Sequence, residues 1–131
     1  MIGVDTNVLV RFLVRDDEPQ FQRALKLIRR EISAGRQVLV SLLVLLETEW
    51  VLRSRYRFRK QEIVDVISGL LEAADIEFED EPTVEEALFV WKDNGVGFAD
   101  CLVSARNRRL GCTSTATFDA RASRLPGFVT A

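Results

Sequence analysis

Short apolar runs alternate with longer amphipathic stretches along this chain, and this alternation constrains the fold more than any other feature of the sequence. The first run, residues 2–4, is followed at once by polar side chains and is typical of a strand buried in a parallel sheet. Helical spacing of apolar residues between such runs predicts βαβ units. We therefore expect an α/β domain with a central, mostly parallel sheet of about five short strands flanked by helices.

Capping and turn residues set the limits of the predicted helices. Pro19 stands in a first helical turn, Gly35 ends that helix, and Ser41 is placed to cap the next one. We interpret the acids of residues 16–18 as a helix start and those of residues 77–86 as a solvated face and a helix start. The predicted helices cover residues 8–15, 16–33, 41–52, 61–73, 82–91 and 98–109, and the predicted strands after the first lie at 38–40, 76–78, 111–119 and within 121–129.

Length and composition exclude several classes of protein. The 131 residues fit one domain, residues 1–131, and no apolar run approaches the ~20 residues that cross a bilayer. We therefore expect a cytoplasmic protein with no membrane partner. Cys101 and Cys112 are expected to be buried free thiols. The chain has no histidine, which excludes His-based triads and HExxH zinc sites and leaves carboxylates or hydroxyls for any catalysis.

Four acidic residues stand where an α/β fold places its functional groups. Asp5 follows the first strand and Asp119 follows a later one, and ligands bind at such strand ends. Asp100 lies in the first turn of a helix, where it could also serve only the helix dipole.

Glu47 is the fourth acid and lies in a helix that is apolar nearly all round. An ionised carboxylate there is costly unless a cation meets it. We favour Glu47 over Glu49 as the functional acid, because Arg53 can pair with Glu49 at the surface.

A cluster of these four carboxylates would require a cation. Converging carboxylates repel one another, and divalent cations neutralise that repulsion. Oxygen ligands favour Mg²⁺ or Mn²⁺. Such a metal can activate water for an in-line attack on a phosphodiester, which is the task that a histidine would otherwise perform.

The same residues carry a family resemblance that spans the chain in order. Asp5-Thr6-Asn7, residues 44–47 leading into 50–52, residues 98–100, and residues 117–119 followed by 125–128 resemble the motifs of PIN-domain ribonucleases, and among these the VapC toxins of toxin–antitoxin pairs. The resemblance implies that Asp5, Glu47, Asp100 and Asp119 bind Mg²⁺ or Mn²⁺ and catalyse RNA cleavage.

The resemblance also assigns roles to neighbouring residues and to partners. Asn7 and Thr117 would hydrogen-bond the carboxylates or a bound water, and Thr6 would cap the first helix. Family members act on RNA, form homodimers and are silenced by a VapB-like antitoxin whose C-terminal segment occupies the active-site groove. One departure stands at Gly97, where many relatives carry a further acid.

Arginines are the candidates for contacts with RNA phosphates. The net charge of −2 does not by itself indicate a nucleic-acid-binding protein. The densest basic stretch, residues 53–60, is interleaved with Tyr56 and Phe58 and could hold RNA, or could simply complement the end of a helix. The candidates are Arg11, Arg15, Arg53, Arg55, Arg121 and Arg124.

Three other functions can be compared with the nuclease. A phosphotransferase of the haloacid-dehalogenase type needs an acid two residues after the first aspartate, and Asn7 stands there. A receiver-type signalling domain needs a phospho-acceptor aspartate at a central strand end, and residues 38–40 offer none. The main alternative is a non-catalytic PIN-fold module that binds a protein or RNA partner, although four close acids would destabilise a fold that binds no metal.

Overall fold

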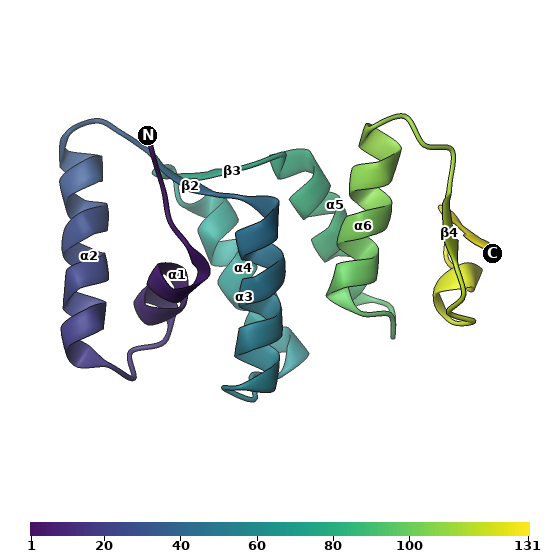
Figure 1. Cartoon of the computed structure of the whole chain (residues 1–131), viewed down its shortest axis with the longest axis horizontal. Coiled ribbons are helices and arrows are strands. Elements are labelled where there is room, and N and C mark those ends of the chain that lie inside the picture. The colour runs from purple at the N-terminus through teal and green to yellow at the C-terminus, as the bar shows by residue number, and fades with distance from the viewer. The chain divides into compact units, whose positions relative to one another are not determined.

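Five short strands and six α-helices alternate along the chain, and every strand pairing is parallel (Figure 1). This computed structural model describes residues 1–131. It divides into two compact units, Met1–Glu79 and Asp80–Ala131. The expected α/β class is confirmed, but the strands form a three-stranded and a two-stranded sheet where we expected one.

The first unit is built on the three-stranded sheet. Strand β1 (Ile2–Gly3) pairs with β2 (Val38–Val40), and β2 pairs with β3 (Ile76–Phe78). The strands are connected by helices, as parallel strands require. These helices are α1 (Thr6–Leu13), α2 (Glu18–Ser33), α3 (Leu42–Ser54) and α4 (Lys60–Glu72).

Two helices of this unit begin at the same edge of the sheet. Because β1 and β2 are parallel and each runs directly into a helix, α1 and α3 start side by side (Figure 1). Ser41 caps α3 as expected, accepting a hydrogen bond from the Val44 backbone N–H at 3.2 Å. The prediction that Thr6 caps α1 was wrong. Asp5 is the cap, accepting from the Val8 N–H at 2.9 Å, and Thr6 is buried in the first turn.

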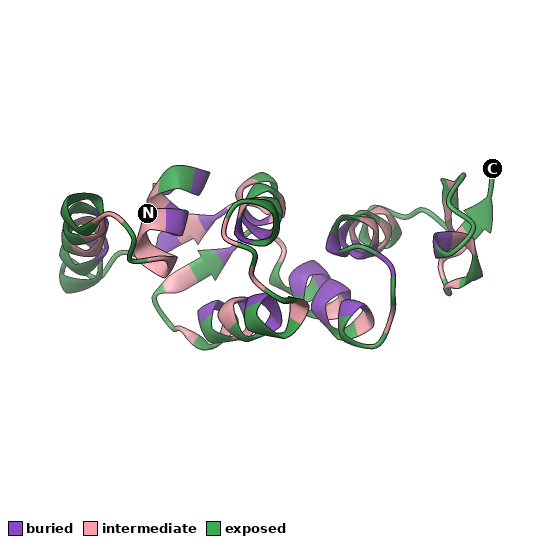
Figure 2. Cartoon of the chain, turned by 90° about the horizontal axis from the view of Figure 1, so that it is seen from below, coloured by how far each residue is buried: buried purple, intermediate pink, exposed green.

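Apolar side chains from the helices and strands form the core of the first unit. Leu9, Leu45, Leu52 and Ile63 are each at most 2% exposed, and burying one such side chain contributes about 1.5–3 kcal/mol. The buried residues occupy only part of each helix surface (Figure 2). The regularly spaced apolar side chains seen in the sequence therefore hold the sheet edge and the starts of α1 and α3 in place.

The second unit combines a helix pair with the two-stranded sheet. Helix α5 (Glu81–Lys92) packs against α6 (Phe98–Arg109), and the Trp91 and Phe98 rings lie 5.1 Å apart. Strand β4 (Thr115–Thr117) pairs with β5 (Phe128–Thr130), which follows a short 3₁₀ turn, η1 (Ala122–Arg124). The predicted final strand is thus present, at Phe128–Thr130.

Asp80 stands at a helix start as expected, as the N-cap of α5, but it is not solvated. Its side chain is only 9% exposed and forms ion pairs with Arg106 at 2.7 Å and Arg109 at 2.8 Å. It also accepts a hydrogen bond from the Thr83 hydroxyl at 2.6 Å. Asp80 therefore joins the start of α5 to the last turns of α6, a tertiary contact that a run of acids in the sequence does not reveal.

Two further expectations concern the cysteines and the membrane. Neither cysteine forms a disulfide, and Cys101 is buried as expected, but Cys112 is exposed because it follows the end of α6 in a surface turn. None of the helices combines the length and the apolar character needed to span a bilayer.

Candidate active site

Asp5, at the end of β1, and Glu47, in α3, line one pocket. Asp5 has an extended backbone (φ −87°, ψ 175°) that turns the chain from the strand into α1. Its side chain shares a pocket of about 280 Å³ with Asn7 and Glu47. Two carboxylates distant in sequence thus line the same pocket at the sheet edge where α1 and α3 begin. The pocket offers oxygen donors and no nitrogen or sulfur ligand from histidine or cysteine.

The burial predicted for Glu47 was wrong, because Glu49 is the buried acid of α3. Glu47 is exposed, and Leu43, one turn before it, is 79% exposed. Glu49 is 3% exposed and pairs with Arg53 at 2.8 Å. Nearly every residue around the two acids is apolar, so the sequence pattern could not show which side of α3 faces the core. Glu47 nevertheless lines the pocket with Asp5, whereas Glu49 is engaged in the ion pair.

Asp100 and Asp119 belong to the second unit. Asp100 is half-buried in the first turn of α6, as the sequence predicts. Asp119 follows β4 and is exposed. Its Oδ1 accepts hydrogen bonds from the backbone N–H groups of Ala122 and Arg121, at 3.0 Å and 2.7 Å. These two bonds hold the pKa of the Asp119 carboxyl below its usual range, so the group is ionised at neutral pH.

Thr117 supports Asp119 through the backbone. Its hydroxyl accepts a hydrogen bond from the Asp119 N–H at 3.0 Å. This contact fixes the backbone of the residue that carries the carboxylate, and the expected bond from Thr117 to a carboxylate or a bound water stays a prediction. Asn7, the other predicted supporting residue, lies exposed at the pocket rim beside Asp5.

Two of the four predicted acids, Asp5 and Glu47, lie in the first unit, and the other two, Asp100 and Asp119, lie in the second. Neither unit by itself brings together three or more acidic, histidine or cysteine side chains that could hold a metal ion. In the first unit, Asp5, Asn7 and Glu47 supply oxygen donors around one pocket. That donor chemistry fits a hard cation such as Mg²⁺ or Mn²⁺, and PIN domains typically bind divalent metals.

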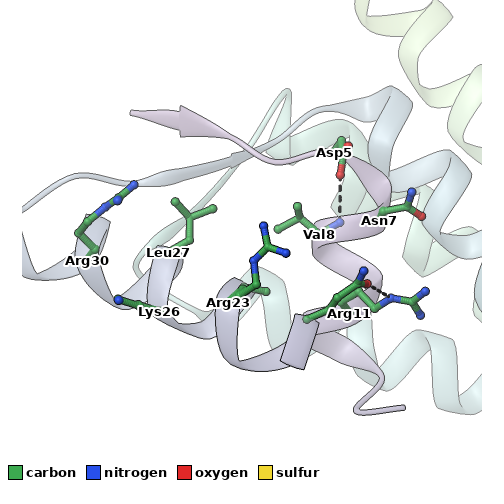
Figure 3. Close-up of a pocket in the computed structure, with 10 residues that line it drawn as sticks. Asp5, Asn7, Val8, Arg11, Arg23, Lys26, Leu27 and Arg30 are labelled. Atoms are coloured by element: carbon green, nitrogen blue, oxygen red, sulfur yellow. Dashed lines mark hydrogen bonds between the residues drawn. The ribbon is translucent and has the colours of Figure 1, made fainter. Parts of the chain in front are cut away.

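A second, larger pocket adjoins Asp5 and is lined by four cations, of which only Arg11 was expected from the sequence. It has a volume of about 630 Å³ and lies between α1 and α2 (Figure 3). Asp5 and Asn7 line it as well as the smaller pocket. The i, i+3, i+7 spacing of three of its basic residues on α2 could have revealed it, because that spacing marks one face of a helix. The basic residues of this pocket are Arg11, Arg23, Lys26 and Arg30.

Several of the predicted RNA-contacting arginines are engaged within the protein. Arg11 donates to Gln20 at 2.6 Å and to the Tyr56 hydroxyl at 2.9 Å, and it pairs with Asp16. Arg15 pairs with Glu18 at 2.7 Å and lies over the Phe21 ring.

The other four candidate arginines differ in whether they interact with partners within the protein. Arg53 pairs with Glu49, and Arg121 donates to the Gly95 carbonyl at 3.4 Å. Arg55 and Arg124 are exposed and have no ion-pair partner. Of the six arginines, only Arg11 lines the pocket beside Asp5.

Comparison with known proteins settles the family. A sequence model of the PIN domain matches residues 2–127. The chain belongs to the PIN-domain family. This PIN domain is also similar to a protein of Aquifex aeolicus (strain VF5) named VapC ribonuclease, with 27% identity over 128 residues that cover 97% of this chain and 93% of the relative. The family resemblance stated from the sequence motifs is thereby confirmed.

Proposed function

We propose that this PIN domain is a metal-dependent endoribonuclease and the toxin of a VapBC-type toxin–antitoxin pair. The observation that carries the proposal is the pocket shared by Asp5, Asn7 and Glu47 at the end of β1. Membership of the PIN-domain family and the similarity to a VapC ribonuclease support the same activity.

In the proposed reaction, the carboxylates of Asp5, Glu47, Asp100 and Asp119 would hold Mg²⁺ or Mn²⁺. When bound, the cation would supply an activated water and stabilise charge on the phosphodiester. Asp5 has its Oδ1 committed to the cap of α1, which fixes the orientation of the carboxylate toward the pocket. Asp119 is likewise fixed, by two backbone N–H groups and by Thr117. The predicted products carry 5′-phosphate and 3′-hydroxyl ends.

The partners proposed by similarity are an RNA substrate, a VapB-like antitoxin and a second copy of the chain, acting in the cytoplasm. Leu43 and Trp50 on α3 are 79% and 50% exposed. Exposed apolar side chains of this kind support a self-complementary face of a homodimer. The alternative is a non-catalytic module that binds RNA or protein. Such a module would bind its partner at the same pockets but would not cleave RNA.

Cleavage of a mixed pool of tRNA and messenger RNA tests the proposal. We expect cutting in Mg²⁺ or Mn²⁺ and none with EDTA. The variants Asp5→Asn, Glu47→Gln, Asp100→Asn and Asp119→Asn keep side-chain shape but remove charge, and each should lower the rate at least about 100-fold, since several kcal/mol of charge stabilisation are lost.

Asp17→Asn is the matched control for Asp5→Asn. Asp17 caps α2 by accepting from the Gln20 N–H at 3.1 Å and lies outside both pockets, so its variant should cut RNA like the wild type. Equal rates for the wild type and all four site variants would favour the non-catalytic module. Products with cyclic 2′,3′-phosphate ends would contradict the proposed attack by water.

A further inference from the structure

The pocket between α1 and α2 holds positive charge that the fold itself does not use. Arg23 and Lys26 are exposed, and neither forms an ion pair or a hydrogen bond through its side chain. Arg30 approaches Glu31 at 3.6 Å but remains 66% exposed, and Glu31 is held more closely by Arg36 at 2.6 Å. The pocket therefore presents a row of three available cations along one face of α2 (Figure 3).

The pocket is continuous in its lining with the candidate active site. Asp5 and Asn7 belong to both, so a ligand placed at Asp5 has the basic pocket on one side and Glu47 on the other. Residues 23 and 30 are about 10 Å apart along α2, because an α-helix rises about 1.5 Å per residue. A row of cations of that length suits a chain of repeated anions better than a single one.

The lining also indicates how such a chain would be held. Its apolar members are only Val8, Ala24 and Leu27, and no aromatic ring lines it. Without a ring there is no surface on which bases could stack, and side-chain charges would contact phosphates instead. A protein segment would be expected to find a larger apolar or aromatic anchor. The lining thus favours a nucleic-acid backbone over an acidic peptide.

We infer that Arg23, Lys26 and Arg30 of α2 bind the phosphate backbone of single-stranded RNA next to the cleavage site, without selecting its bases. This inference rests on the proposed ribonuclease function, because that function brings a phosphate to Asp5. Arg11 also lines the pocket, but it interacts with Asp16, Gln20 and Tyr56. It therefore shapes the pocket wall, and its charge is less available to a ligand.

Binding of a short fluorescent single-stranded RNA, measured in EDTA over a range of salt concentrations, tests the inference without cleavage. The slope of log K against log salt is negative, and each lost phosphate contact reduces its magnitude by about 0.7 for a single strand. The double variant Arg23→Gln/Lys26→Gln should therefore reduce the magnitude of the slope by about 1.4. Uridine-only and adenosine-only strands should lose the same amount. Arg29→Gln is the matched control, since Arg29 is exposed on the same helix outside this pocket and should keep the wild-type slope.

The outcomes separate this inference from the proposed function. Cleavage with metal, combined with an unchanged slope in the double variant, would overturn the α2 contact and leave the nuclease standing. A slope of reduced magnitude in the double variant, without cleavage by the wild type, would keep the contact and reject the nuclease. An oligoglutamate that binds more tightly than RNA of equal charge, and loses affinity in the double variant, would assign the pocket to an acidic protein segment and overturn the inference.

Discussion

Gly97 is the N-cap of α6 and lies beside Asp100, at the position where the family resemblance leads one to expect an additional acid. Its backbone is extended (φ −65°, ψ 153°) and no side chain caps the helix. A Cβ added at Gly97 would meet only Asp100 Oδ2, at 3.9 Å, which is an ordinary contact. The fold therefore has room for the acid that this chain lacks.

We expect Gly97→Asp to bind Mn²⁺ more tightly than the wild type, because it places a second carboxylate next to Asp100. Isothermal titration calorimetry measures the affinity. Gly97→Asn is the control that caps α6 equally well without adding charge, and both variants should stabilise the protein by a few tenths of a kcal/mol. Equal Mn²⁺ affinities for the two variants would show that residue 97 has no part in metal binding.

Two buried threonines differ in whether their hydroxyl groups have a partner. Thr48 in α3 is 3% exposed, and its Oγ1 is buried without a hydrogen bond. Thr83 in α5 is fully buried, and its hydroxyl donates to Asp80 at 2.6 Å. A buried hydroxyl without a partner costs free energy, whereas one bonded to a carboxylate contributes it.

Replacing each threonine by valine, which has a similar shape, should therefore shift stability in opposite directions. We expect Thr48→Val to raise the free energy of unfolding by about 1 kcal/mol and Thr83→Val to lower it by about 2 kcal/mol. Urea denaturation of the two variants beside the wild type checks this. A loss of stability in Thr48→Val would mean that its hydroxyl has a partner in solution.

At the scale of elements, one carboxylate links α5 to α6. Asp80 is held between Arg106, Arg109 and Thr83, and it has a left-handed backbone (φ 56°) that Asn also tolerates. Burial of the side chain raises the pKa of Asp80, but the hydrogen bonds from Thr83 and Arg106 and the charge of Arg109 outweigh burial. The result is a pKa below the ordinary value of 3.8.

A lowered carboxyl pKa in the folded state gives stability that is complete above the unfolded-state pKa and is lost as the pH falls. We expect Asp80→Asn to cost about 1–3 kcal/mol at neutral pH. The difference from wild type should shrink as the pH drops below about 4, where the carboxyl group of the unfolded chain takes up a proton, and it should disappear once the pH falls below the lower pKa of the folded protein. Urea denaturation at a series of pH values measures it. Glu85→Gln, at an exposed acid of α5 without an ion-pair partner, should match the wild type throughout.

At the scale of the whole molecule, the alternation of strands and helices was predictable because local patterns determine it. Apolar periodicity, Pro19, Gly35 and Ser41 placed the elements close to their observed limits. Strand pairing depends on contacts between distant segments, and so the sequence did not reveal that the five strands divide into two sheets.

For the site residues too, features that depend on the local sequence were predictable, and features that depend on tertiary contacts were not. Asp5 and Asp119 could be proposed as site residues because each follows the end of a strand. The burial of Glu49 and the ion pairs of Asp80 were missed because they depend on which helix face meets the core and on a partner helix. The basic face of α2 was missed because isolated cations on a polar helix face are common, and only the neighbouring α1 turns them into a pocket.

The cap formed by Asp5 has a consequence for how such a protein can change over evolutionary time. Asparagine caps a helix about as well as aspartate, so folding alone does not distinguish the two at position 5. The proposed metal site is what would favour the acid. A copy released from selection for the proposed cleavage could therefore lose that activity through a substitution at this position and still persist as a folded protein.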